Sequence, residues 1–459
     1  MGKSIKIIGG KSFMKKTIVH LLSVVALVLP LFCGTFATKA SAASYFELAA
    51  HWAPQIYQDV NADLNVRADF ITNFNYDGDY LALNNWDNLD NYNENGYVYY
   101  KVAETLTHYF IEYDLFHARD DAYTRPLDAH ENDFEGLILV IRKDGSTYGT
   151  FQLMETMAHN QWYDYTNDTT ITSGSDNVDG GVLFNGSHPK VFCQANGQSP
   201  SGGHGVHAYD GSSAPGGDGI VYDYTGTAQF PTNTAGSYVN HYGYALIEWG
   251  DLWSKRNDPN IFSSWGTIAG NNHTANSANA PWGWDDSDDG PTLQGMNWSD
   301  PAHQVDVHLN NLGSFSHSYV YNPYYSHQIV LVNTQSMADR DPFGGKSDIY
   351  IKAYVNGQGQ TDARFWKKND APMYQNYNIV FGANDAEFGP NFSESYNSIY
   401  VAKPSNTNVE IHVYDSDGTS GDDDMGYVSA VVAPGTTKTW ENVVTSNGQA
   451  KVSATVRAQ

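Results

Sequence analysis

Apolar positions along this chain fall in short aromatic and β-branched runs, separated by clusters of Asn, Asp, Gly and Ser, and helix-period patterns are few. Such runs are typical of strands joined by turns. In the first half they predict strands at 97–102, 107–117, 148–157, 182–184 and 189–193, with a buried apolar run at 137–141. The dipeptide Asp144-Gly145 marks a hairpin turn. The pattern therefore predicts an all-β protein.

Two stretches depart from this pattern. Residues 45–58 predict a short helix, whose length Pro54 limits because proline cannot continue a helix interior. Residues 210–310 are low in regular pattern and dense in Gly, Asn, Asp and Trp, which is typical of a functional or flexible segment. Within it, Trp282 and Trp284 fit a carbohydrate platform, a membrane-interface belt or ordinary sheet packing.

From residue 328 onward the strand patterns become cleaner, with turn signals between them. They lie at 328–333, 349–355, 377–381, 398–402, 409–414, 427–432 and 450–456. Strands of this kind predict an independent antiparallel β-sandwich of about 130 residues. Because 459 residues suffice for two or three domains, we expect a β-sandwich with long irregular loops at 43–324 and a smaller one at 325–459.

The first 42 residues have the pattern of a secretory signal peptide. A lysine pair at 15–16 precedes an apolar run at 18–32, and the small residues 40–42 follow, which matches the charged, apolar and cleavage regions of such a peptide. No later stretch has the length and apolarity of a membrane helix. We therefore expect 1–42 to be a signal peptide, and the mature protein to be secreted and extracellular.

The chain is strongly acidic. Its formal net charge is −26, and loss of the leader, which has six lysines and no acidic residue, leaves about −32. Nucleic acid is excluded as a partner, because one polyanion repels another, whereas uptake of cations fits the charge and solubility alone is the other explanation. Without the leader, Cys193 is the only cysteine. Metal ions are therefore candidates for the staples that disulfides supply in other exported proteins.

The densest group of chemically active residues is HENDFE at 130–135, which runs directly into the buried apolar run. In an extended chain Asp133 and Glu135 lie on one face, and like charges so close are costly unless a cation or a proton lies between them. His130 can reach the same point. The segment therefore predicts a divalent-cation site or a catalytic carboxylate pair, and the alternative is a polar strand end with solvated acids.

A second acidic cluster follows later, where Asp415-Ser416-Asp417 precedes Asp423 and Gly426. A hard cation such as Ca²⁺ prefers several oxygen ligands, which spaced aspartates supply. This spacing, together with GKSDIYIK at 345–352, resembles the calcium loops of the C2 domain, the calcium-dependent phospholipid-binding module of protein kinase C type. Asx-rich hairpin turns are the structural alternative.

The C2 resemblance implies a set of calcium ligands and a partner. The implied ligands are Asp341, Asp348, Asp415, Asp417 and Asp423. Asp341 is one residue out of the usual spacing, and Ile349 replaces the usual proline. The implied partner is an anionic phospholipid surface, because bound Ca²⁺ neutralises the acidic loops and attracts anionic lipid.

The segment 130–135 resembles the heptapeptide of the necrosis-inducing, Nep-like toxins, which are β-sandwich cytolysins with a divalent cation at this motif. Asn132 and Phe134 replace the second histidine and the tryptophan of that family. The resemblance implies a cation site formed by Asp121 (or Asp120), His130, Asp133 and Glu135.

The wider frame at 45–210 resembles the vacuolar-protein-sorting-type relatives of those toxins. It shares an early Ala-Pro-x-x-Tyr, here 53–57, and a later Gly-x-His around His204. In the Gly-rich loop that carries them, His204 and His207 are either ligand-contacting groups or incidental surface residues.

Three functions fit these features. The leading hypothesis is a secreted, calcium-dependent membrane-binding protein with a toxin-like cytolytic N-terminal domain. The first alternative is a metal-dependent hydrolase acting on lipid or glycan headgroups, with Glu135 or His130 as general base. The second is an adhesion or lectin-like protein whose ions are structural. The N-terminal metal stays open, with Ca²⁺ or Mg²⁺ favoured over Zn²⁺.

Overall fold

The computed structural model describes residues 1–2 and 43–458, with gaps at 124–128, 160, 198–202, 265, 285–300, 317–318, 325–326, 339–346, 356–357, 369–372, 375–376, 379–397, 400–406, 416–421 and 434–435. The expected signal peptide, Asp341 and Asp417 lie outside the described residues. The described chain consists mainly of strands, which confirms the all-β prediction. No helix in the described part has the length and apolarity needed to cross a membrane.

The N-terminal part contains many short strands and a few short helices. The strands are β1 (Gln55–Asp59), β2 (Tyr97–Thr105), β3 (His108–Asp120), β4 (His130–Arg142), β5 (Thr150–Ala158), β6 (Gln161–Tyr165), β7 (Thr172–Ser173), β8 (Val178–Gly180), β9 (Phe184–Asn185), β10 (His188–Cys193), β11 (Val206–Ala208), β12 (Asp218–Tyr224), β13 (Gly236–Glu248), β14 (Leu309–Asn310) and β15 (Tyr319–Tyr321). The helices are α2 (Tyr45–Trp52), η2 (Val66–Asp69), η3 (Ala82–Asn84), α3 (Asn85–Asn88), η4 (Pro215–Gly217), α4 (Gly250–Ser254), η5 (Pro281–Gly283) and α6 (Pro301–His308).

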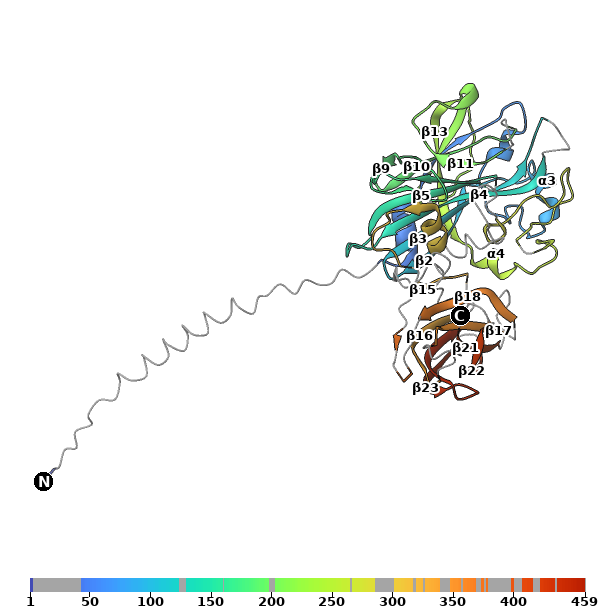
Figure 1. Ribbon diagram of the computed structural model, residues 1–459. Helices are drawn as coiled ribbons and strands as arrows, with labels where there is room; N and C mark the ends of the chain where they lie inside the picture. The colour runs from blue at the N-terminus through green and yellow to red at the C-terminus, as the bar shows by residue number, and fades with distance from the viewer. Residues whose placement is uncertain are drawn as a thin grey trace. The chain divides into compact units, whose positions relative to one another are not determined.

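Most of these strands belong to one large sheet, in the order β11-β10-β1-β12-β13-β2-β3-β4-β5-β6-β8. Figure 1 shows its middle strands β2, β3, β4 and β5 side by side. The sheet curls, because β11 at one end of this order packs against β5 near the other end. The space inside holds an apolar core to which both halves contribute, including Ile56, Leu139 and Val191. The opposite face of the central strands packs on a second core that includes Trp249 and Trp282.

Strand β4 is the centre of this arrangement, since its residues 131–141 are buried without a break. Leu137 and Leu139 enter the inner core, while Ile138 and Val140 enter the second core. A strand covered on both faces needs apolar residues at consecutive positions rather than at alternate ones. This explains why the sequence shows a continuous apolar run here.

One expectation for the N-terminal part needs correction, and one question that the sequence left open is decided. Residues 210–310, expected to be irregular, include β12 and the long strand β13, which pair in parallel. Strand β13 is rich in Tyr and largely half-exposed, so most of its length lacks the apolar run by which buried strands are recognised. Trp282 and Trp284 are 1% and 2% exposed, so their role is packing and not a surface platform.

The expected helix at 45–58 is shorter than its pattern suggested. Helix α2 begins after Ser44, whose hydroxyl accepts a hydrogen bond from the Glu47 backbone while the Glu47 carboxylate accepts one from the Ser44 backbone. This capping box satisfies backbone N–H groups of the first turn. The helix ends at Trp52, just before Pro54, and β1 follows.

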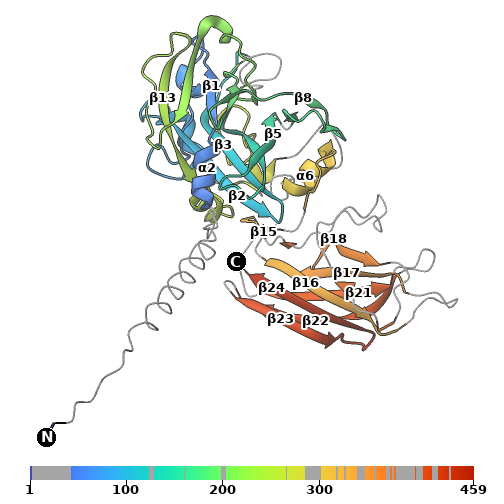
Figure 2. The ribbon, with the colours of Figure 1, turned by 90° about the vertical axis from the view of Figure 1, so that its left-hand side faces the viewer.

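The C-terminal part is built from two antiparallel sheets (Figure 2). Its strands are β16 (His327–Ser336), β17 (Ile349–Val355), β18 (Gln358–Lys368), β19 (Tyr377–Asn378), β20 (Ser398–Ile399), β21 (Thr407–Asp415), β22 (Asp423–Val432), β23 (Thr437–Val444) and β24 (Ala450–Ala458). One sheet has the order β19-β16-β24-β23 and the other β18-β17-β21-β22. Strand β22 packs against β23 and β24 across the two sheets, which gives the sandwich expected from the sequence. Strands β18 and β23 were not foreseen.

A glycine in β4 tests whether both faces of this strand are tightly covered. A Cβ atom at Gly136 would lie 2.6 Å from Tyr113 O and 2.6 Å from Asp114 Oδ1. We expect Gly136→Ala to lower the free energy of unfolding by about 1–3 kcal/mol, because neighbouring strands must shift to admit the methyl group. Urea unfolding of both proteins checks this. The control is Gly250→Ala, where the nearest atom is 3.9 Å away; equal stability losses in the two variants would contradict the packing described.

Candidate functional sites

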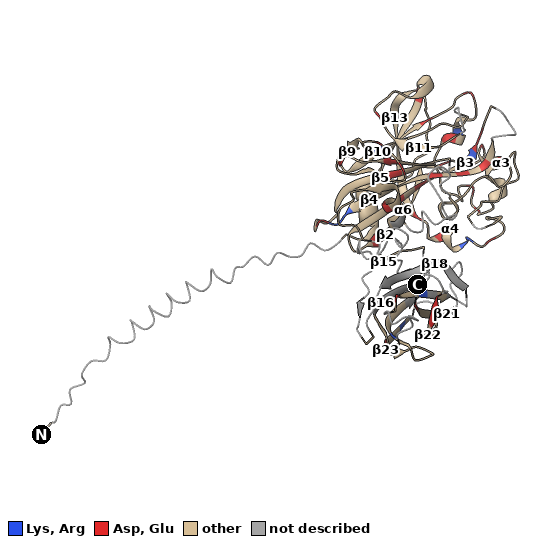
Figure 3. Ribbon diagram, viewed as in Figure 1, with Lys and Arg blue, Asp and Glu red and all other residues tan. Residues whose placement is uncertain are grey.

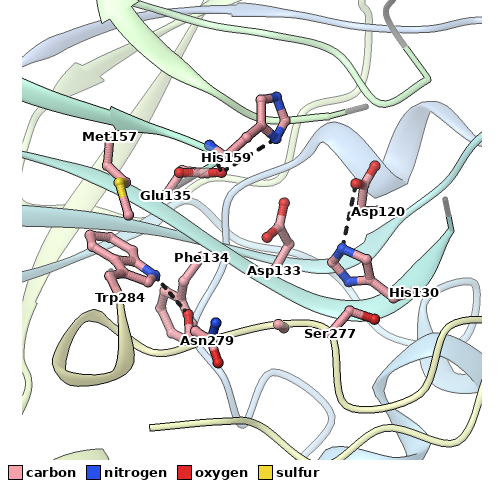
Figure 4. A pocket seen from close by; sticks show the side chains of 11 residues that line it. Asp120, His130, Asp133, Phe134, Glu135, Met157, His159, Ser277, Asn279 and Trp284 are labelled. Carbon is pink, nitrogen blue, oxygen red and sulfur yellow. Dashed lines mark hydrogen bonds and ion pairs between the residues drawn. The ribbon is translucent and has the colours of Figure 1, made fainter. Parts of the chain in front are cut away.

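The segment 130–135 opens into a pocket at the start of β4, with a volume of about 180 Å³ (Figure 4). Its polar lining includes Asp120 from β3, three residues of β4 and one residue that follows β5. These residues are Asp120, His130, Asp133, Glu135 and His159. Red segments, which mark Asp and Glu, recur along the ribbon of the N-terminal part, whereas the blue of Lys and Arg is sparse (Figure 3). The structure therefore gathers the imidazole and the carboxylates of the motif in a single cavity.

A local departure from strand geometry brings these side chains to one place. Asn132 has a φ of 62°, a left-handed conformation that Asn tolerates better than most residues. Its Nδ2 donates to Ala82 O at 3.0 Å, and its Oδ1 accepts from Asn85 Nδ2 at 2.6 Å. Strict alternation would place His130 and Asp133 on opposite faces. The break at Asn132 lets both line the same pocket.

A buried histidine holds Asp133 in position. His204 Nδ1 is 2.9 Å from Asp133 Oδ2, and its Nε2 is 3.4 Å from Asp69 Oδ1. The His204 ring stacks on His117 with their centroids 3.7 Å apart. Burial alone would lower the pKa of His204, but the hydrogen bond to Asp133 and the nearby carboxylate of Asp69 outweigh it and raise the pKa to about 10. His204 is therefore a cation at neutral pH.

The same contact controls the charge of Asp133. Burial would raise the pKa of Asp133, but the hydrogen bond and the charge of His204 outweigh it, so the pKa is lowered. Glu135 shows the opposite effect, because burial and then the charge of Asp133 raise its pKa well above the ordinary value. The Glu135 Oε1 accepts a hydrogen bond from the His159 backbone at 3.0 Å. The pocket thus pairs an ionised carboxylate with one that is poised to hold a proton.

Asp120 is the third carboxylate of the pocket. Its Oδ2 lies 3.6 Å from His130 Nε2 and accepts from the Gly203 backbone at 3.4 Å. A Cβ atom at Gly203 would lie 2.4 Å from Asp120 Oδ1, so glycine is needed for this close approach. Burial raises the pKa of Asp120 to about 6.

Of the two aspartates considered as the additional ligand, Asp120 lines the pocket and Asp121 does not. The Asp121 Oδ1 accepts from the Ala122 backbone at 2.9 Å, and its Oδ2 lies 3.7 Å from Arg119 Nη1. Successive residues of a strand point to opposite faces, so only one of the pair can face the pocket. The guanidinium of Arg119 directs Asp121 to the other face.

The donor set of the pocket fits a divalent cation. Three carboxylates and one imidazole supply the oxygen and nitrogen ligands that such ions take, and the buried Asp120 Oδ1 has no hydrogen-bond partner. Asp120, His130, Asp133 and Glu135 would hold the ion. A bound ion would polarise an oxygen of a headgroup or activate a water.

In the C-terminal part, three of the five predicted ligands are described, and the strand register brings them to one end of one sheet. Asp415 at the end of β21 pairs with Asp423 at the start of β22 and with Ile349 of β17, next to Asp348. The Asp348 backbone N–H donates to Asp415 Oδ1 at 2.5 Å. Asp415 is buried and Asp423 is exposed. These carboxylates therefore form an acidic end that is open to solvent on one side.

The glycine of the same motif has a structural role. Gly426 has a φ of 89°, and a Cβ atom there would lie 2.5 Å from Asn447 Oδ1. Its backbone N–H donates to Asp424 Oδ1 at 2.6 Å. Only glycine combines this φ with so close a neighbour, so Gly426 shapes the irregularity of β22 between Asp424 and Tyr427 that follows the acidic loop.

Part of the N-terminal site has no clear signal in the sequence. His204, for which the sequence leaves an incidental surface position open, is fully buried. Asp69, His117 and His159 lie near the motif in the fold, although nothing in the sequence around them predicts it. The loop containing Gly203 and His204 gave the one usable signal, since a Gly-rich loop allows a close backbone approach. The long-range pairing of His204 with Asp69 leaves no trace in local sequence.

Comparisons with known proteins find similarities for both parts of the chain. Residues 326–443 match the family model of the C2 domain. Among solved structures, a C2 domain of plant extended synaptotagmin 1 is 14% identical, over 30% of this chain and 95% of that one, with a TM-score of 0.20. Over the N-terminal region, NLPPya in complex with mannosamine is 13% identical, over 53% of this chain and 86% of that one, with a TM-score of 0.29. The non-toxic HaNLP3 protein is 14% identical, over 48% and 84%, with a TM-score of 0.24. No curated protein sequence matches the chain.

The buried ion pair of His204 predicts a pH-dependent stability. We expect His204→Gln, in chelator, to lower the free energy of unfolding by about 3–5 kcal/mol, because it leaves buried carboxylates without their cation. A raised folded-state pKa gives stabilisation that is complete below the ordinary value of 6.5 and is lost as the pH rises through about 10. The difference between the two proteins should therefore shrink from pH 6.5 upward in urea titrations.

The control for this experiment is His241→Gln. His241 pairs with Asp223 at 2.6 Å, but its side chain is 52% exposed, so its loss should cost less than about 1 kcal/mol. A His204→Gln deficit that stays constant across the pH range would contradict the charge assigned to His204.

Proposed function

We propose that this chain is an exported protein that docks on anionic phospholipid membranes through Ca²⁺ bound to its C2 domain, and that its N-terminal domain then acts on that membrane as a toxin-like cytolysin. The observation that carries the proposal is the acidic end of the C2-matching region, where Asp348, Asp415 and Asp423 converge. Asp341 and Asp417 would complete the ligand set.

The docking step follows from charge. The acidic end would repel an anionic membrane without calcium, and the whole chain is strongly acidic. Ca²⁺ shared between the carboxylates would cancel their charge and leave coordination positions for headgroup phosphate oxygens. Affinity would then depend on both calcium and anionic lipid. Export, which the N-terminal 42 residues support, would place the protein where free calcium is abundant.

The second step depends on the N-terminal pocket. Its cation, held by Asp120, His130, Asp133 and Glu135, would contact the headgroup region of the target membrane. The pocket is small and polar, so it suits a headgroup and not an acyl chain. The membrane would be disrupted at its surface once the C2 domain holds the protein there.

A second candidate function is a metal-dependent hydrolase with the same docking module. The observation that favours it is the pocket itself, in which Glu135 and His130 both lie beside Asp133. A carboxylate or an imidazole next to a bound ion suits a general base. Whichever of Glu135 and His130 the ion leaves free would transfer the proton, and products in a lipid or glycan digest would distinguish this function from cytolysis.

Variants of the two sites should separate docking from membrane damage. With dye-loaded anionic vesicles, we expect Asp423→Asn to raise the calcium needed for half-maximal pelleting at least about tenfold, because an exposed ligand carboxylate is lost. We expect Asp133→Asn to pellet normally but to release little dye. Pelleted protein and released dye are read in the same tube.

The matched control is Glu441→Gln, which removes one negative charge from an exposed position on β23. It should behave like the unaltered protein in both assays. Equal pelleting by Asp423→Asn and Glu441→Gln across the calcium titration would contradict the assignment of Asp423 to the docking site. Full dye release by Asp133→Asn would remove the pocket from the cytolytic step.

A further inference from the structure

A second cluster of ligand-type side chains lies deep inside the N-terminal part, away from the pocket. Glu155 on β5, Asp164 on β6 and His308 at the end of α6 each offer one ligand atom, and these three atoms lie within 4.8 Å of one another. His308 Nδ1 is 3.3 Å from Glu155 Oε1 and 3.9 Å from Asp164 Oδ2. Helix α6 lies beside β5 (Figure 2). Among the residues that the structure describes, no other group of three or more meets this spacing.

The cluster is shut off from solvent and contains unpartnered atoms. Glu155 and Asp164 are fully buried, and His308 is 3% exposed. Neither carboxylate oxygen of Asp164 has a hydrogen-bond partner. The Gln304 Nε2 donates to Glu155 Oε2 at 2.6 Å, while its Oε1 also has no partner. Buried polar atoms are almost always paired, so a buried carboxylate aimed at other ligand-type atoms points to a group that they hold together.

The charge of the cluster leads to the same conclusion. Apart from His308, no described basic side chain forms an ion pair with Glu155 or Asp164. Glu155 and Asp164 are paired directly across β5 and β6, so their two buried carboxylates lie close together. Buried carboxylates this close need a cation or a proton between them.

We propose that Glu155, Asp164 and His308 bind one divalent transition-metal ion, for which Zn²⁺ is the first candidate. Zn²⁺ takes imidazole nitrogen and carboxylate oxygen at about 2.0–2.2 Å, which places neighbouring ligands of a tetrahedral site about 3.4 Å apart. The distances of 3.3 and 3.9 Å from His308 Nδ1 are close to this value. Ca²⁺ and Mg²⁺ fit less well, because they prefer oxygen ligands alone.

This ion would be structural. A fully buried site gives no access to a substrate, and the three ligands come from two strands and one helix. The His308 backbone O also accepts hydrogen bonds from the backbones of Gly174 and Asp176, at 2.8 and 3.2 Å. The ion would therefore fasten α6 and the loop between β7 and β8 onto the edge of the sheet. In the described part of the chain the one cysteine is free and buried. An ion at this position would supply the kind of cross-link that disulfides supply in other exported proteins.

The rival explanation is a proton shared between Glu155 and Asp164, without a metal. The two explanations differ for Asp164→Asn. A shared proton predicts that the amide replaces the protonated acid with little loss, whereas a metal site loses a charged ligand. His308→Gln removes the nitrogen ligand and leaves both carboxylates. It should therefore weaken metal binding if an ion is held there, whereas a proton shared between the carboxylates does not need the imidazole.

The test measures binding of Zn²⁺ alone to the full chain. Metal is first removed with chelator, and saturating Ca²⁺ is then added to occupy the C-terminal loops. In calorimetric titration, we expect Asp164→Asn and His308→Gln each to bind one equivalent less Zn²⁺ than the unaltered chain. Zn²⁺ should also raise the melting temperature of the unaltered chain more than that of either variant. The matched control is Asp168→Asn, an exposed turn residue nearby, which should keep the full stoichiometry.

Equal zinc stoichiometry in the unaltered chain, Asp164→Asn and His308→Gln would overturn the proposal. It would also be overturned if zinc raised the melting temperature of neither the unaltered chain nor Asp164→Asn. If a variant does not fold, crystals of the unaltered chain soaked in Zn²⁺ decide. An anomalous peak within about 2.0–2.3 Å of Glu155, Asp164 and His308 supports the site. Zinc peaks elsewhere with none at these residues would exclude it.

Discussion

The burial of β4 on both faces is the constraint on which the N-terminal fold and its pocket depend. Its apolar residues join two cores, one inside the curled sheet and one outside it. The same strand begins with polar residues, and its position in the sheet carries them into an environment with little water. There, burial and neighbouring charge decide which carboxyl ionises. The opposite pKa shifts of Asp133 and Glu135 are therefore a consequence of the fold.

The buried carboxylates of the structure also need neighbouring positive charge. His204 compensates Asp133 and Asp69 within the pocket, whereas the buried Glu155–Asp164 pair has the single imidazole of His308 beside it. An acidic protein can balance such groups by taking up cations. Metal ions would then act in three ways in one chain, as a bridge to lipid, as the reactive centre of the pocket and as an internal staple.

Much of the fold could be predicted from the sequence because buried strands carry a local signal. The apolar run at 137–141 and the strands around Ile351 and Val428 show it clearly. Strand β13 does not, because a half-exposed strand that gains its stability from parallel neighbours has no strong pattern of its own. The N-terminal site could likewise be predicted only where its residues carry a local signal. His130, Asp133 and Glu135 are close in sequence and lie in one pocket, whereas Asp69 and His204 join them only through the tertiary fold.

The most direct test of the central claim is flotation of the unaltered chain with vesicles, comparing anionic with zwitterionic lipid in calcium or chelator. Calcium-dependent docking on anionic lipid predicts that the protein floats only when calcium and anionic lipid are both present. Flotation that persists in chelator, or its absence in every mixture, would contradict calcium-dependent docking through Asp348, Asp415 and Asp423, and would leave these aspartates with a structural role.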